Sequence, residues 1–463
     1  MKMLVLKSSI DRAGPPQASP LQPDTCIDKK ARFLSMNLIC AAAAFLIFPF
    51  GGMAFADPDD PSEWIRFHFD KKPHVTKKVT DRLAIGVALK LTAERARHLD
   101  FESRETETET KLEGQLGLLY DTGGLVRSYL ELNYATESLA SNQSNARDAI
   151  FEVNEAYVSF RNSSGNQALS IGRWSVSDER EWLFEEELDG IHYFHRGHKF
   201  AVEMMYAREQ IFHKDLLEDH DDNEPDHFYT RAYANLPGDK IGSLYGLYQR
   251  GQDRGDADLF WLGLSFAGHV SNDINYWAEL AHVSGREKSR DIRGFGLDVG
   301  LTRTFSQWRS NPRVTAGLAF GSGDDGSGSD TAFRQTDIQG NSDKFGGRTN
   351  FKYYGEVFDP ELSNLAIFTL GLGFDFLNKS SIDIVYHNSF QHRASTKIRN
   401  SNLDRKPNGI SRHLGHEINL VVGVREFKNV DIDLIGGVFF PGSAFDDHDD
   451  PATYLGVEFS LEF

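Results

Sequence analysis

Apolar and polar side chains alternate along most of the chain from Asp81 onward. The stretch Leu83–Leu91 is apolar at every second position, and Phe368–Phe376 and Ile418–Val424 repeat this pattern. A period of two residues places successive side chains on opposite faces of a strand. The sequence therefore predicts about 18 strands with two unlike faces, with ends defined to about two to four residues. The predicted strands are 82–96, 110–121, 125–137, 149–161, 167–176, 189–196, 198–207, 227–236, 241–250, 258–267, 273–284, 292–304, 312–321, 366–377, 381–390, 415–427, 430–440 and 453–463.

The connections between these strands alternate in length. Every second one is short, as at Asp121–Gly124 and Lys428–Asn429, whereas most of the others are long and polar. Short turns at one rim and long loops at the other are typical of outer-membrane barrels. We therefore predict an all-β fold, a single transmembrane antiparallel β-barrel over 81–463 with short periplasmic turns and long extracellular loops. The long connections include 208–226, 322–365, 391–414 and 441–452.

Loop 322–365 is the longest of these connections, and its segment 345–354 also has a strand-like pattern. Counting that segment as a strand would make the number of strands odd and would break the alternation of short and long connections. We therefore assign it to the loop. At this length the loop can fold into the channel, so we expect it to constrict the pore.

Composition narrows the class of membrane protein. The 463 residues are 40% hydrophobic and 25% charged, and the mean hydropathy is −0.43. These values exclude a bundle of transmembrane helices, because each helix needs a run of about 20 apolar residues. Strands, in contrast, hide their lipid-facing side chains in every second position. The formal net charge of −18 argues against nucleic acid as a partner, since phosphate binding needs a basic surface.

The N-terminal region has the features of a secretory signal. One continuous apolar run, Leu38–Phe55, follows Lys29, Lys30 and Arg32 and ends in Ala54–Ala56. A basic flank, a short apolar core and an Ala-x-Ala ending predict a signal peptide over 1–56 that is cleaved after Ala56. A membrane anchor is the alternative, but the break at Pro49–Gly52 leaves the run short of a span. Residues 57–80 would then form a periplasmic N-terminal segment.

Both cysteines, Cys26 and Cys40, lie in the predicted signal peptide. The remaining chain would have no disulfide framework and no thiolate chemistry. The chain ends in an amphipathic strand, Val457–Phe463, with a terminal Phe. A strand of this kind is a recognition signal for barrel-assembly machinery. The alternative interpretation of this strand is the last strand of a β-sandwich. Together these features predict the outer membrane of a Gram-negative cell, with that machinery, outer-membrane lipid and lipopolysaccharide as partners.

Catalytic motifs are absent from the sequence. It contains no Gly-x-Ser-x-Gly, His-Glu-x-x-His or P-loop motif, and Ser389 and His387 have no clear acid partner. We therefore predict a protein that is not an enzyme and needs no cofactor. The acidic loops 215–226 and 446–450 could bind a divalent cation, but their spacing matches no fixed motif. We assign no metal site, and solvated acidic loops are the simpler interpretation.

The predicted barrel interior carries basic side chains. Alternation directs Lys90, Arg127, Arg313 and Arg425 inward, Arg173 lies at a strand end, and loop 322–365 supplies Arg334, Lys344 and Arg348. Because the field inside a low-dielectric channel is local and does not follow net charge, these cations suggest an anionic solute. The alternative is that each cation pairs with a neighbouring carboxylate.

Several irregular segments resemble the alginate-export outer-membrane proteins. The most specific is Phe333–Gly346 followed by Tyr354–Glu356 and Pro360–Leu365, since an irregular loop has little compositional reason to repeat such a string. The other matching segments are Gly172–Arg173, Ser177–Trp182, Leu188–Gly190 and Gly321–Asp324.

The resemblance implies a monomeric 18-stranded barrel that passes an anionic polyuronate outward through an arginine-rich constriction. Arg173 and Arg334 occupy matching positions, and Lys344 follows the matching stretch Gln339–Asp343. It also implies a synthase that drives export, and hence periplasmic polysaccharide-biosynthesis proteins as further partners. A general porin for anions or small solutes is the second hypothesis, and an outer-membrane hydrolase using Ser389 and His387 is the third.

Overall fold

The computed structural model describes residue 75 and residues 77–101, 106–141, 145–217, 224–237, 240–251, 257–271, 273–326, 328–445 and 450–463. All of them belong to the compact unit Ser62–Phe463. The predicted signal peptide with its cleavage site, most of the predicted periplasmic segment, and parts of both acidic loops lie outside the described residues. In the part of the chain that is described, no helix is long and apolar enough to cross a membrane.

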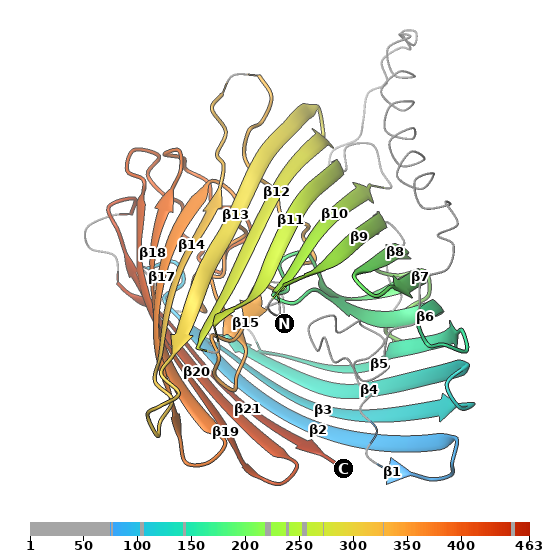
Figure 1. Ribbon diagram of the computed structural model, residues 1–463. Helices are drawn as coiled ribbons and strands as arrows, with labels where there is room; N and C mark the ends of the chain where they lie inside the picture. The colour runs from blue at the N-terminus through green and yellow to red at the C-terminus, as the bar shows by residue number, and fades with distance from the viewer. Residues whose placement is uncertain are drawn as a thin grey trace, which may run out of the picture. The chain divides into compact units, whose positions relative to one another are not determined.

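Eighteen long antiparallel strands form one closed sheet in the described residues (Figure 1). They are β2 (Leu83–Arg97), β3 (Thr106–Asp121), β4 (Val126–Ser141), β5 (Asn145–Arg161), β6 (Gln167–Ser177), β7 (Glu185–Arg196), β8 (Phe200–Arg208), β9 (Asp226–Leu236), β10 (Lys240–Arg250), β11 (Ala257–Ser271), β12 (Ile274–Glu287), β13 (Arg290–Thr304), β14 (Arg313–Gly321), β17 (Leu365–Phe376), β18 (Ser380–Gln391), β19 (His413–Phe427), β20 (Val430–Pro441) and β21 (Ala452–Glu462). Each of the predicted strands corresponds to one of these, so the predicted fold class is confirmed.

The ring closes where the first and last long strands pair. β2 pairs with β21 in antiparallel register, with Leu91 opposite Phe459, and the two-residue strand β1 (Lys77–Lys78) pairs with the start of β2. Closure gives the backbone N–H and C=O groups of the strands partners in neighbouring strands, which is what a lipid environment requires. Along β2 the side chains of Leu89 and Leu91 are exposed on the outer surface, whereas Lys90 lies on the inner face and pairs with Glu458.

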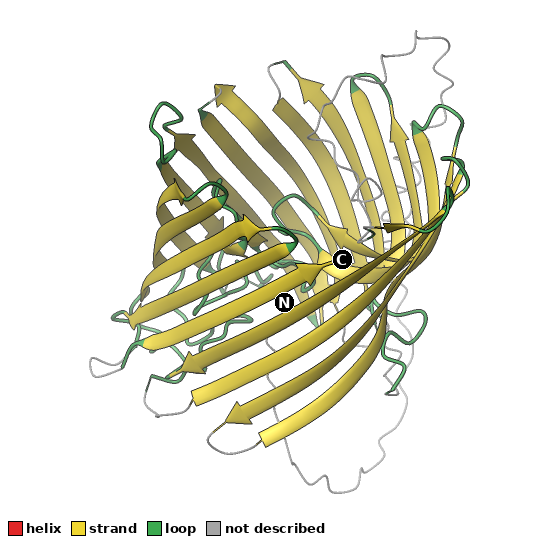
Figure 2. Ribbon diagram, turned by 90° about the horizontal axis from the view of Figure 1, so that it is seen from below, coloured by secondary structure: helices red, strands yellow, loops and turns green. Residues whose placement is uncertain are grey.

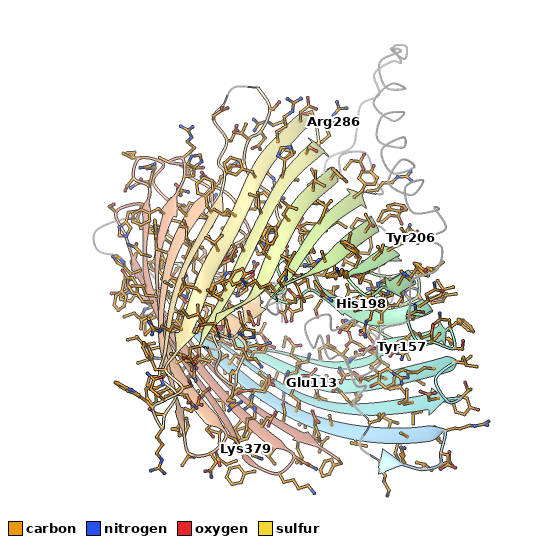
Figure 3. All side chains as sticks on the ribbon, viewed as in Figure 1. Glu113, Tyr157, His198, Tyr206, Arg286 and Lys379 are labelled. Carbon is orange, nitrogen blue, oxygen red and sulfur yellow. The ribbon has the colours of Figure 1, made fainter. Side chains whose placement is uncertain are left out.

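The two rims of the barrel differ as predicted. Short turns join β3 to β4, β17 to β18 and β19 to β20 at one rim, and most of the longer connections lie at the other, where the β12–β13 turn is an exception. Lys379, in the β17–β18 turn, and Arg286, at the end of β12, mark these opposite rims in Figure 3. On the usual orientation of such barrels the short-turn rim is periplasmic and the long-loop rim is extracellular.

Two of the longer connections turn into the barrel. They are the β6–β7 loop (178–184) and the β14–β17 loop (322–364), and Figure 2 shows loop segments enclosed by the strands. The strand-like segment 345–354 is part of the second loop, as predicted. There the short strands β15 (Ser342–Asp343) and β16 (Phe351–Lys352) pair in a separate two-stranded sheet, so the segment adds no strand to the barrel.

Candidate functional site

The β14–β17 loop crosses the barrel interior and bonds to inward-facing side chains of widely separated strands. On β11, the Trp261 indole N–H donates to the Arg334 carbonyl at 2.7 Å, and on β13 Asp298 accepts from the Tyr354 hydroxyl at 2.8 Å. On β19, the buried Glu417 carboxylate accepts the backbone N–H groups of Val357 at 2.8 Å and Phe358 at 3.1 Å. The loop is therefore held on several sides of the lumen.

The β6–β7 loop packs against the β14–β17 loop inside the barrel. The Trp182 indole N–H donates to the Tyr354 hydroxyl at 3.0 Å, and the side-chain amide of Gln335 donates to the Trp182 carbonyl at 3.3 Å. Trp182, Phe333 and Tyr354 are almost completely buried, and the rings of Trp182 and Phe333 stack. Apolar burial and hydrogen bonding together make the two loops one packed unit.

Arg180 joins these two loops to the barrel wall. Its guanidinium lies between the rings of Trp277 (4.3 Å to the centroid) and Tyr353 (4.1 Å). The same group forms ion pairs with Asp343 at 2.9 Å and Asp298 at 3.6 Å. A planar cation stacked between two aromatic rings and paired with two carboxylates suits arginine and not lysine. Arg180 was not among the predicted pore cations, because the alternation of the strands does not report on a loop side chain. It lies within Ser177–Trp182, one of the segments that resemble the alginate-export proteins, and that resemblance is the signal that could have identified it.

Three of the predicted cations are buried in structural ion pairs. Arg313 pairs with Asp375 and Asp383, and Arg334 pairs with Asp330 at 2.7 Å and with Glu287 on β12 at 3.1 Å. Arg173 is 4% exposed and holds Asp189 through two bonds of 2.7 and 2.8 Å. Removing one partner of such a pair leaves an uncompensated buried charge, which is strongly destabilising. These arginines therefore stabilise the contacts between the strands and loops that they join.

Two glycines, Gly172 and Gly190, neighbour the Arg173–Asp189 pair and let the strands around it approach closely. Gly172 and Gly190 lie opposite each other in the β6–β7 ladder, and Arg173 lies opposite Asp189. A Cβ on Gly172 would lie 2.1 Å from a backbone oxygen of β5, and one on Gly190 would lie 2.0 Å from a backbone oxygen of β8. Only glycine permits these close approaches, which bring the charged pair into its buried position.

Three other predicted cations form half-exposed pairs on the inner wall. Lys90 pairs with Glu458 at 2.9 Å, Arg127 with Asp121 at 3.0 Å, and Arg425 with Asp433 at 2.8 Å and Asp431 at 3.2 Å. Ion pairs that water reaches contribute only about 0–1 kcal/mol each. Their partners can therefore be exchanged at little cost.

The last two predicted cations, Lys344 and Arg348, are exposed on the β14–β17 loop. Neither forms an ion pair within the described ranges of the chain. The charge of Lys344 acts to lower the pKa of Asp343, and that of Arg348 acts to lower the pKa of Asp375. Six of the eight predicted cations are thus paired with carboxylates, as the alternative interpretation expected. The inner wall also carries Glu113 and Glu131, so the lumen holds both signs of charge.

Two further cations of the lumen, Arg231 and Arg399, were not predicted from the sequence. On β9, Arg231 is buried and donates to Ser243 at 2.8 Å and to Ser265 at 3.0 Å; its position in the alternation of β9 would have revealed it. Arg399, in the β18–β19 loop, pairs with Glu361 at 2.7 Å and Glu287 at 3.3 Å. No sequence signal identified it, because its partners come from distant segments.

The candidate hydrolase residues Ser389 and His387 both lie buried on the inner face of β18. The Nδ1 atom of His387 bonds to the Thr369 hydroxyl of β17 at 2.9 Å. The histidine is thus bonded to a neighbouring threonine and not to the serine that a nucleophile–base pair would require.

Buried carboxylates in the two inner loops make their packing sensitive to pH. Burial raises the pKa of Glu356 to about 8, and burial together with the nearby Glu185 carboxylate raises that of Glu181 to about 8. Both groups are protonated more readily in the packed loops than in exposed ones. Their contribution to packing is therefore fully present below pH about 4.5 and is lost as the pH rises through about 8.

We expect the β14–β17 loop to loosen between pH 6 and pH 9, so that single-channel conductance in planar bilayers rises over this range. Replacing Glu181 and Glu356 by glutamine keeps both side chains uncharged and should make the rise smaller. The rise should not vanish, because burial also raises the pKa of Glu361 in the same loop to about 7. A conductance that rises on acidification, or a profile identical in the double variant, would contradict this assignment.

Comparison with known proteins places the chain in a family. The model of the family described as "Alginate export" matches residues 70–456. Alginate production protein AlgE of Pseudomonas aeruginosa is 27% identical over 259 residues, which are 47% of this chain and 50% of that protein. AlgE of Pseudomonas syringae pv. tomato is 23% identical over 348 residues, 60% of this chain and 68% of that protein. The match thus spans about half the length of the first of these relatives.

Solved structures share the fold. Pseudomonas aeruginosa OccK7 (OpdD) superposes with a TM-score of 0.55 at 12% identity, covering 82% of this chain and 99% of that one. Pseudomonas aeruginosa OccK2 (OpdF), solved in complex with glucuronate, gives 0.53 at 12% identity, covering 82% and 98%. The present chain shares the barrel fold of these proteins. The family match covers nearly all of that barrel, and the chain belongs to the alginate export family.

Proposed function

We propose that the barrel is a passive channel that exports an anionic exopolysaccharide, an alginate-like polyuronate, across the outer membrane. Family membership supports the class of polymer. The observation that carries the proposal is the position of Lys344 and Arg348, two exposed cations on a loop inside a closed barrel. We further propose that the β14–β17 loop constricts the pore, that the chain acts as a monomer without a catalytic role, and that periplasmic polysaccharide-biosynthesis proteins supply the polymer.

The two kinds of lumen cation would act differently on such a polymer. The buried pairs of Arg173, Arg313 and Arg334 hold loops and strands, so the polymer cannot reach them without unfolding the site. The half-exposed pairs, such as Lys90 with Glu458, could exchange a protein carboxylate for a uronate carboxylate, since each pair is worth about 0–1 kcal/mol. Weak, repeated contacts of this kind let a chain enter the pore and also leave it.

Mannuronate oligomers should block the ion current of the channel in planar bilayers, and the block should depend on the two exposed loop cations. We expect the double variant Lys344→Glu/Arg348→Glu to weaken the block about tenfold or more, because a loss of about 1.4 kcal/mol suffices for that factor. The matched control is Lys379→Glu/Lys428→Glu, which places the same charge change in periplasmic turns. Oligomers that leave the wild-type current unchanged, or equal effects of both double variants, would refute the proposal.

The second candidate is a porin for small anions. Two packed loops cross the lumen, which favours small solutes over polymers, and OccK2, a barrel of the same fold, was solved with a monomeric uronate. Liposomes containing the protein separate the two hypotheses. Swelling in glucuronate combined with no block by mannuronate oligomers would favour the small-solute porin.

A further inference from the structure

A row of polar and aromatic side chains crosses the outer, lipid-facing surface of the barrel. Phe368 of β17 lies opposite Asn388 of β18, which lies opposite His416 of β19, which lies opposite Phe440 of β20. Phe368 and Phe440 are exposed on this surface. Directly opposed residues share a face of the sheet, so Asn388 and His416 also point outward. This part of the surface lies on the strands drawn from orange to red in Figure 1.

The side chains of this row are held in place by hydrogen bonds and ring contacts with one another. The Tyr386 hydroxyl bonds to Nδ1 of His416 at 2.6 Å, and Nε2 of His413 bonds to the Asn388 side-chain oxygen at 3.1 Å. The two imidazole rings are 4.8 Å apart, and Phe390 lies 4.9 Å from His413. These contacts fix two histidines side by side where a barrel would ordinarily present apolar groups to lipid.

The row lies where the outer edge of the hydrocarbon core is expected. Below it, toward the periplasmic turns, Ile384 and Leu420 form an apolar pair, followed by Phe374 beside Ile382. A tilted strand crosses the core in about 9–11 residues. Counted along β18 from the periplasmic turn near Lys379, that distance ends close to Asn388. The polar row therefore marks the boundary between the acyl chains and the head groups of the outer leaflet.

Two arginines stand just beyond this boundary. Arg412 precedes His413 and donates to the His392 carbonyl at 3.3 Å, and Arg393 follows His392. Both arginines are exposed, and neither forms an ion pair in the described part of the chain. Partial burial lowers the pKa of the His392 imidazole, and the charges of Arg393 and Arg412 lower it further. Asp324, in the neighbouring loop, is already paired with Arg290 at 2.9 Å.

We propose that this outer surface, made of His392, Arg393, Arg412, His413 and His416, binds the phosphorylated head group of lipopolysaccharide. The arginines would hold a phosphate by charge-assisted bonds. The histidines and the flanking aromatic rings would pack against the glucosamine disaccharide, and the apolar rows below would contact its acyl chains. The proposal is independent of what the channel transports, because the surface lies outside the lumen.

The test uses the full barrel in detergent, with native mass spectrometry as the readout and lipid A as the probe. We expect the wild-type protein to retain bisphosphorylated lipid A and to bind the fully dephosphorylated form at least about tenfold more weakly. Arg393→Ala/Arg412→Ala should lose the same factor for the bisphosphorylated form only. Arg393→Lys/Arg412→Lys should recover part of it, because the charge returns without the planar fork.

Arg286→Ala/Arg309→Ala is the matched control, since it removes two exposed arginines elsewhere on the barrel. Heat-modifiable migration on gels reports whether each variant has folded, and all four substitutions replace exposed side chains. Equal losses in test and control variants, or binding that ignores the phosphates, would overturn the proposal. Displacement of lipid A by mannuronate oligomers would also overturn it and would assign the surface to the polymer instead.

Discussion

Replacing residues 323–363 by a short turn should increase the single-channel conductance about threefold or more. Barrels of this strand number leave an aqueous channel when nothing fills them, and the β14–β17 loop bonds to strands on several sides of the lumen. The replacement should leave the barrel intact. The backbone N–H of Asn364 donates to the Ser322 carbonyl at 3.0 Å, so a turn of about four residues can join these ends.

The control for this experiment shortens the β13–β14 turn (305–312), which lies at the periplasmic rim. It removes residues from the barrel without touching the inner loops, so the conductance should stay near the wild-type value. A folded loop-replacement protein that conducts no better than the wild type would show that the loop does not limit the pore.

Arg180→Ala should release the two inner loops from the barrel wall. The substitution leaves Asp298 and Asp343 without their shared cation and removes a guanidinium from between two rings. Breaking a buried pair in this way costs about 3–5 kcal/mol. We expect a cysteine introduced at the buried Val357 position to react with a thiol reagent about a hundredfold faster or more in this variant.

The labelling experiment needs a cysteine-free background, and we expect the chain after cleavage to provide it, because Cys26 and Cys40 both lie in the predicted signal peptide. Arg180→Lys is the matched control. It keeps the charge but not the planar stacking surface, and its labelling rate should fall between those of the wild type and the alanine variant. If Arg180→Ala labels as slowly as the wild type, Arg180 does not hold the loops.

The strands could be predicted with their ends correct to within about four residues, because their environment is simple. Every position from Leu83 to Arg97 faces either lipid or lumen, so one alternating pattern reports the whole element. The short β3–β4 turn was equally readable, since the Asp121 carboxylate accepts the backbone N–H groups of Gly123 and Gly124. Local chemistry decides such features, and the sequence contains all of it.

The lumen was predicted less completely. Alternation identified Lys90 and Arg425 as inward-facing and would also have identified Arg231. It could not reveal that Lys90 has Glu458 as its partner. The two residues lie on the first and last long strands, so almost all of the barrel sequence separates them along the chain. Arg180 and Arg399 lie in loops that have no period, so their sequence neighbours carry no information about direction.

The sequence by itself determined the class of fold, the number of strands, the two unlike rims and the family. These follow from side-chain periodicity, turn chemistry and an irregular loop motif, all of which are local along the chain. Only the tertiary structure decided which cations are paired and how the inner loops pack. Those features depend on closure of the ring, which brings residues from opposite ends and distant loops within bonding distance.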